Sequence, residues 1–99
     1  MASNVKLTKK FDLQKLDTAI LTALSTRGAA ETYVLWNILA SWPERPFYRT
    51  GLETRHVLTA CQRLCRRGHV EDAPTPYVVM KAWRLTPAGL EALREVEGR

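Results

Sequence analysis

The 99-residue sequence lacks any apolar segment long enough to cross a lipid bilayer. Its longest apolar stretch, from Tyr33 to Ala40, is interrupted by Asn37 and falls far short of the roughly 20 residues that a spanning helix needs. The N-terminus also lacks the charged, apolar and cleavable pattern of a secretion signal. We therefore expect a cytoplasmic protein with no membrane partner.

Cysteine is scarce, and the two residues present, Cys61 and Cys65, lie four positions apart on one predicted helix. This spacing near an apolar face is typical of packed thiols and not of a secreted disulfide framework. A zinc site would need more ligands, and His56 falls on the side of the helix that points away from both thiols. The sequence predicts free core cysteines, no metal and no cofactor.

Groups that converge for catalysis are also missing from the sequence. The ten acidic residues are scattered, and the neighbours Glu71 and Asp72 would point to opposite sides of a strand. There is no phosphate-binding glycine loop, no nucleophile elbow, and no histidine with an acid and a nucleophile in a suitable context. These absences argue against an enzyme.

Positive charge is what the sequence has in excess. Fifteen Lys and Arg residues against ten Asp and Glu residues give a formal net charge of +5. Clustered cations attract polyanions such as nucleic acid, although a basic surface can also serve solubility alone. The positions of the cations along the chain must therefore decide between a nucleic-acid-binding surface and a surface that serves solubility alone.

The stretch from Thr50 to Gly68 separates apolar and basic residues onto opposite faces of one helix. Its apolar face consists of Val57, Cys61, Leu64 and Cys65. Its polar face consists of Arg55, Thr59, Gln62, Arg63 and Arg66. Thr50 followed by Glu53 fits a capping box, and Gly68 fits a C-terminal stop. We expect the helix at residues 51–67 to be held by the rest of the chain, with Arg55 and Arg63 dispensable for the core.

Two further helices are expected before this one. The sequence predicts a flexible basic tail at residues 1–10 and a single domain at residues 11–97. Asp12 is a good N-cap for a first helix that runs to about Ser25, and the segment 28–30 is a short link. A second helix is expected over residues 31–42, with Trp42 on its inward face.

Aromatic residues of the second helix and of the loop after it exceed what one core needs. Tyr33 and Trp36 lie off the inward stripe, which favours a surface for self-association or for another protein. The prolines of the following loop break the helix, and we expect Phe47 to fix that loop to the core. Tyr48 in the same loop is a third candidate for a protein interface.

A hairpin and a last helix complete the order of elements. Residues 69–72 and 77–85 are strand candidates on either side of a proline-rich turn. Thr86 and Pro87 give an N-cap and a first helical residue for a helix that runs to about Val96.

Two segments resemble the winged helix-turn-helix family, and its PadR-like and MarR-like bacterial regulators in particular. They are Arg63-Leu64 through Gly68-His69-Val70-Glu71, and Trp83-Arg84-Leu85-Thr86-Pro87-Ala88-Gly89-Leu90. The resemblance covers Leu13 to about Glu95. It implies an α+β, mostly α fold, in which a three-helix bundle carries a two-stranded β-hairpin wing and a C-terminal helix.

In that family the third helix enters the major groove of DNA, and the wing lies along the backbone or the minor groove. The residues that would contact base edges or phosphates by position are Arg55, Thr59, Gln62 and Arg63. Flanking phosphates would be contacted by Arg66 and Arg67, and the wing contacts would be Lys81 and Arg84. The chain departs from the family in its long connection over residues 42–49 and in a wing tip without cations.

The resemblance and the basic helix together predict a sequence-specific binder of double-stranded DNA, in the role of a small transcriptional regulator that acts as a homodimer. An alternative is a winged helix that binds protein, such as an adaptor or a phage or host inhibitor of a nucleic-acid machine. That alternative would use Tyr33, Trp36 and Tyr48.

Overall fold

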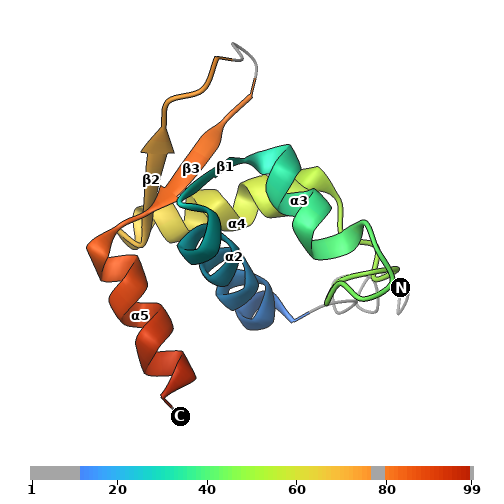
Figure 1. Ribbon diagram of the computed structural model, residues 1–99, viewed down its shortest axis with the longest axis horizontal. Helices are drawn as coiled ribbons and strands as arrows, with labels where there is room; N and C mark the ends of the chain where they lie inside the picture. Colours follow the sequence, from blue (N-terminus) through green and yellow to red (C-terminus); the bar gives the residue numbers. More distant parts are fainter. Residues whose placement is uncertain (1–11, 77–79, 99) are drawn as a thin grey trace, which may run out of the picture.

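The computed structural model describes residues 12–76 and 80–98 and confirms the predicted α+β, mostly α fold. Helices and strands alternate irregularly along the chain (Figure 1). In order they are α2 (Leu13–Arg27), β1 (Ala29–Glu31), α3 (Thr32–Ala40), α4 (Thr54–Arg66), β2 (Val70–Ala73), β3 (Ala82–Leu85) and α5 (Pro87–Glu97). The predicted tail at residues 1–10 lies outside the described residues.

Helix α2 lies between α3 on one side and α5 on the other, and α4 packs against it from behind (Figure 1). Its first turn is capped as predicted, because the Asp12 carboxylate accepts from the backbone N–H of Gln14 at 2.8 Å and of Lys15 at 3.3 Å. The helix ends at Gly28, whose φ of 90° suits glycine. Its apolar side is buried in the core: Leu16, Ile20, Leu21, Ala23 and Leu24.

The sheet has three antiparallel strands in the order β1-β3-β2, and not the two that the sequence predicts. The expected link at residues 28–30 becomes most of β1, which pairs Ala29 with Arg84 and Glu31 with Ala82. β1 has little β-propensity of its own, so pairing with β3 accounts for its extended backbone. β3 is shorter than the predicted strand over 77–85, of which residues 77–79 lie outside the described part.

Thr32 joins the start of α3 to the central strand of the sheet. Its backbone N–H and its hydroxyl both donate to the carbonyl oxygen of Lys81, at 2.9 and 3.0 Å. The hydroxyl oxygen in turn accepts from the indole N–H of buried Trp83 at 2.9 Å. Each polar group of this buried contact therefore has a partner, which removes the cost of burying it.

The connection between α3 and α4 is held to the core at several points. Phe47 is buried, as predicted, and its N–H donates to the carbonyl of Leu39 at 2.9 Å. The indole N–H of Trp36 donates to the carbonyl of Leu52 at 2.7 Å. The prediction that Trp42 faces inward is wrong, because α3 ends at Ala40 ahead of the prolines and leaves Trp42 60% exposed.

The start of α5 sits directly against the end of the segment that follows α4. Thr86 caps α5 as predicted, since its hydroxyl accepts from the N–H of Gly89 at 3.0 Å, and it also donates to the carbonyl of Gly68 at 2.6 Å. A Cβ placed on Gly89 would lie 2.0 Å from the carbonyl oxygen of His69. The Thr-Pro-Ala-Gly motif therefore encodes a cap followed by a close backbone contact.

Replacing Gly89 by alanine should destabilise the fold by about 1–3 kcal/mol or more, because the new methyl group meets backbone that cannot rotate away. Urea denaturation would measure the loss. Gly98→Ala is the matched control, since its Cβ would come no closer than 3.2 Å to another atom. Equal midpoints for the two variants would contradict the close packing of α5.

Candidate nucleic-acid interface

Helix α4 starts later than the sequence suggests. Its N-cap is Glu53, whose backbone N–H donates to Nδ1 of His56 at 2.9 Å. The predicted cap, Thr50, instead uses its hydroxyl to donate to the carbonyl of Phe47 at 2.7 Å, within the preceding loop. The helix therefore covers Thr54–Arg66 and not 51–67, and the turn after it ends at Gly68 with a φ of 82°.

The apolar face of α4 is buried largely as predicted. Val57, Cys61 and Leu64 are in the core together with Ala60. Cys65 is a correction, because it is exposed at the edge of that face. Burial raises the pKa of the Cys61 thiol to about 12, and the negative charge of Asp17 adds to this effect.

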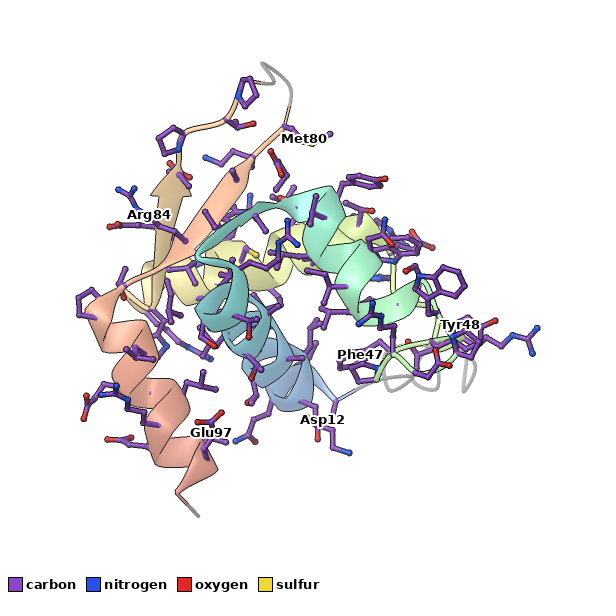
Figure 2. The ribbon with its side chains drawn as sticks, viewed as in Figure 1. Asp12, Phe47, Tyr48, Met80, Arg84 and Glu97 are labelled. Atoms are coloured by element: carbon purple, nitrogen blue, oxygen red, sulfur yellow. The ribbon has the colours of Figure 1, made fainter. Side chains whose placement is uncertain are left out.

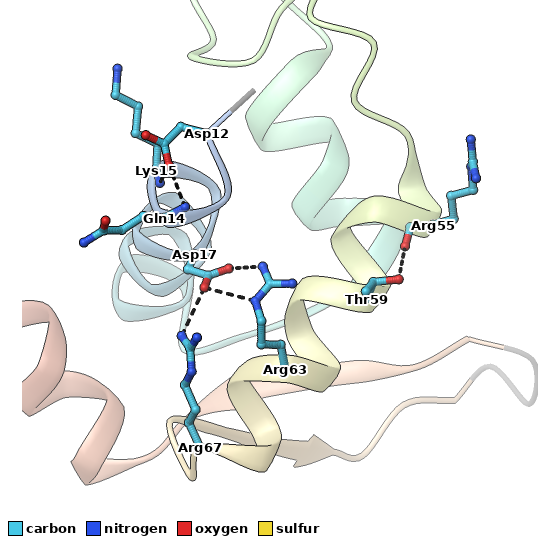
Figure 3. Close-up of polar contacts among 8 residues, drawn as sticks. All are labelled: Asp12, Gln14, Lys15, Asp17, Arg55, Thr59, Arg63 and Arg67. Carbon is cyan, nitrogen blue, oxygen red and sulfur yellow. Dashed lines mark hydrogen bonds and ion pairs between the residues drawn. The ribbon is translucent and has the colours of Figure 1, made fainter. Parts of the chain in front are cut away.

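Arg63 is not the freely exposed side chain that the sequence predicts. Its guanidinium donates to both carboxylate oxygens of Asp17 on α2, from Nη2 at 2.5 Å and from Nε at 3.3 Å. Arg67 reaches the same carboxylate, with Nη1 3.2 Å from Oδ2 (Figure 3). The prediction that Arg63 stands free on the polar face is therefore wrong, since it partners an acid whose side chain is only 11% exposed.

A different stripe of α4 faces the wing. Lys81 lines two hollows beside α4, one shared with β2 and β3 and the other with the start of α3. The α4 residues that line one or the other are Thr54, Arg55, Leu58, Gln62, Cys65 and Arg66, which we call the wing-side stripe. At 100° per residue they fall within about 120° of one another around the helix axis, which places them on one side of the helix. Figure 3 shows Arg55 pointing away from α2, opposite to Arg63.

Of the remaining predicted contacts, Lys81 lines both hollows beside this stripe, and Thr59 follows it on α4, whereas Arg84 lies on the other face of the sheet. Thr59 is exposed, and its hydroxyl donates to the carbonyl of Arg55 at 3.0 Å. On the wing, Lys81 pairs with Asp72 at 2.6 Å and Arg84 with Glu71 at 2.7 Å. Ion pairs exposed to this degree are weak, so these cations remain able to exchange a carboxylate for a phosphate. Arg84 projects from the outer side of the wing (Figure 2).

Arg55 and Arg66 differ in their surroundings. Arg55 pairs with Glu53 at 2.7 Å in a well-exposed contact. Arg66 is exposed and has no ion pair with any residue in the described part of the chain. The stripe therefore combines a free guanidinium, an exchangeable one and the amide of Gln62, which together supply hydrogen-bond donors for an anionic surface.

The three residues predicted for a protein interface differ in how far they are exposed. Tyr33 is 49% exposed, whereas Trp36 packs against the core and is hydrogen-bonded to the loop. Tyr48 is half-buried at the far end of that loop, with the Arg49 guanidinium 5.7 Å from its ring centre (Figure 2). The exposed aromatic that sequence reasoning missed is Trp42, and Pro43 after it was the available signal. The homodimer stays a prediction.

The described part of the chain comprises residues 12–76 and 80–98. These residues contain no group of three or more His, Cys, Asp or Glu side chains that could hold a metal ion. No helix in the same ranges is both long enough and apolar enough to cross a membrane.

Two solved structures share this arrangement of helices and strands. The PcaV transcriptional regulator of Streptomyces coelicolor, in complex with its natural ligand, matches 84% of the chain at 24% identity with a TM-score of 0.65. The fold is a MarR-type winged helix. A mutant of MarR from E. coli matches 80% of the chain at 15% identity with a TM-score of 0.62.

The winged helix described here spans about half the length of each of those chains, 52% of PcaV and 51% of MarR. No family model matches the sequence, and no curated protein matches it either. The likeness therefore establishes the fold. Helix α4 is the amphipathic helix predicted for residues 51–67.

Arg63→Ala should lower the free energy of unfolding by about 1.5–3 kcal/mol, because it removes two charge-assisted hydrogen bonds from a largely buried carboxylate. Urea denaturation would measure this change. Arg55→Ala on the same helix is the matched control and should stay within about 0.5 kcal/mol, since its ion pair is exposed to solvent. Identical stability of the two variants would contradict the structural role of Arg63.

The two thiols should differ sharply in reactivity. A thiol reagent added to the folded protein at neutral pH should modify exposed Cys65 quickly and Cys61 only after unfolding, because burial keeps the Cys61 thiol protonated and inaccessible. Counting modified thiols with and without urea would test this. Equal rates for both in the folded protein would show that α4 is packed differently.

Proposed function

We propose that this protein binds double-stranded DNA as a transcriptional regulator, with α4 in the major groove and the wing-side stripe turned to the bases. The observation that carries the proposal is the division of α4 into a buried apolar face and a wing-side stripe on which Arg55, Gln62 and Arg66 present exposed donors. A helix of this diameter fits the major groove, where side-chain donors and acceptors distinguish base pairs.

Within this proposal the side chains have separate roles. Arg55 and Gln62 read base edges, because Arg pairs with guanine and Gln with adenine through two hydrogen bonds each. Arg66 and Thr59 contact phosphates that flank the groove. Lys81 and Arg84 hold the backbone beside the wing after giving up their acidic partners, which neutralises phosphate charge without naming a sequence.

The structural neighbours support this proposal in general terms. PcaV is described as a transcriptional regulator, and its structure shares the winged helix of this chain. The net charge of +5 agrees with a polyanionic partner. The proposal also includes a homodimer, because one helix reads only a few base pairs and two-fold pairing doubles the contacts on a palindromic site.

A protein-binding function is the second candidate, and the exposed aromatics favour it. Trp42 is 60% and Tyr33 49% exposed, and aromatic side chains of this kind often dominate protein interfaces. Trp42 lies in the loop after α3, whereas Tyr33 lines the same hollow as Arg55 and Lys81. Substitution of Trp42 can therefore tell the candidates apart.

Binding to random-sequence duplex DNA at several salt concentrations tests the proposal. The logarithm of the affinity should fall linearly with the logarithm of the salt concentration, because phosphate neutralisation releases counterions. Arg66→Ala should make this slope shallower by about one unit. Arg94→Ala on α5 removes the same charge from an exposed site and is the control, expected to leave the slope unchanged.

Two results would count against DNA binding. One is a parent protein that does not bind duplex near physiological salt, and the other is an Arg66→Ala variant that behaves like Arg94→Ala. Trp42→Ala completes the set, because a DNA-binding protein should keep its affinity in this variant. A protein-binding module would instead depend on that exposed aromatic.

A further inference from the structure

Asp17 gathers arginines from the same segment that is proposed to bind DNA. The segment 54–67, formed by α4 and its C-cap, carries four arginines: Arg55, Arg63, Arg66 and Arg67. The carboxylate of Asp17 accepts two hydrogen bonds from Arg63 and one from Arg67 (Figure 3). Half of the arginines of this segment are therefore directed to α2 and away from the wing-side stripe.

Burial makes this arrangement firm. The side chain of Asp17 is 11% exposed, and that of Arg63 is 23% exposed. A carboxylate this far from water needs charged partners, since removing one leaves a charge that the interior solvates poorly. Arg63 supplies donors from two nitrogens, which also restricts how α4 can turn about its own axis relative to α2. Arg67, at 54% exposure, is the more loosely held of the two.

A regulator's discrimination depends on how weakly it binds the wrong sequences. Each arginine that reaches a phosphate strengthens binding to every sequence alike, and only contacts to base edges add discrimination. Two more arginines free to bind phosphates would therefore raise affinity for unrelated DNA without improving recognition.

We propose that Asp17 is a specificity-determining positioning residue, an inference that rests on the proposed DNA-binding function. It withholds Arg63 and Arg67 from the phosphates and fixes the rotation of α4, so that the wing-side stripe faces the bases and binding to unrelated DNA stays weak. Asp17 acts through the two arginines and does not itself touch DNA.

The test compares Asp17→Asn with the parent on a random-sequence duplex at salt concentrations from about 50 to 200 mM. The variant should bind this duplex several-fold more tightly at the lowest salt, with a salt slope steeper by about one to two units, because the arginines are released. Glu91→Gln is the matched control, since it removes the same charge from an exposed residue of α5. A purely structural role for Asp17 would instead weaken binding by lowering the folded fraction, which urea denaturation reports.

Arg67→Gln keeps the inference testable if Asp17→Asn does not fold. In the parent, losing Arg67 should leave the salt slope unchanged, because Asp17 already holds that side chain. Where Asp17→Asn does fold, the same change in its background should make the slope shallower by about one unit.

The outcomes separate the inference from the function beneath it. If the parent binds DNA and Asp17→Asn has the same salt slope as the parent, the role of Asp17 is overturned and DNA binding stays in place. The same conclusion follows if the single variant Arg67→Gln has a shallower salt slope than the parent. A parent that does not bind duplex at all overturns both. A gain for Asp17→Asn that Glu91→Gln does not share supports the inference.

Discussion

The hydroxyl of Thr32 is the contact on which the relation between the helices and the sheet depends. It accepts from the indole N–H of Trp83, within β3, and donates to the carbonyl of Lys81, just before β3. One hydroxyl group therefore links the first residue of α3 to the start of the central strand. Since β3 is the central strand and runs straight into α5, its position sets that of β2 and of the last helix.

Elements with local signals were predictable from the sequence. Asp12 and Thr86 mark the starts of their helices, because an N-cap side chain accepts from a backbone N–H only two or three residues further along the chain. Such a contact can be predicted from the order of residues alone. The buried side of α4 follows from helical periodicity alone, as Val57 and Leu64 illustrate. Cys65 was misplaced because it lies at the edge of that side, where one neighbouring element decides between core and solvent.

Features that depend on distant segments were missed. The Ala-Ala-Glu of β1 has no strand pattern and becomes extended by pairing with β3, more than 50 residues further along the chain. Arg63 was assigned to a polar surface because a helical wheel shows which way a side chain leaves its own helix and not which residue of α2 approaches it. Asp17 gave no signal either, since an acid beside an apolar stripe usually points to water.

The separation between the wing-side stripe and the core has a consequence for how this scaffold can change. The side chains of Gln62 and Arg66 form no hydrogen bond or ion pair within the described residues, and Arg55 pairs only with exposed Glu53. The buried residues Val57, Cys61 and Leu64 and the ion pair of Arg63 hold α4 in place. Substitutions of Arg55, Gln62 and Arg66 can therefore accumulate without disturbing the packing of α2 against α4. The same backbone can thus carry different side chains on the exposed side of α4 while the orientation of α4 relative to α2 stays unchanged.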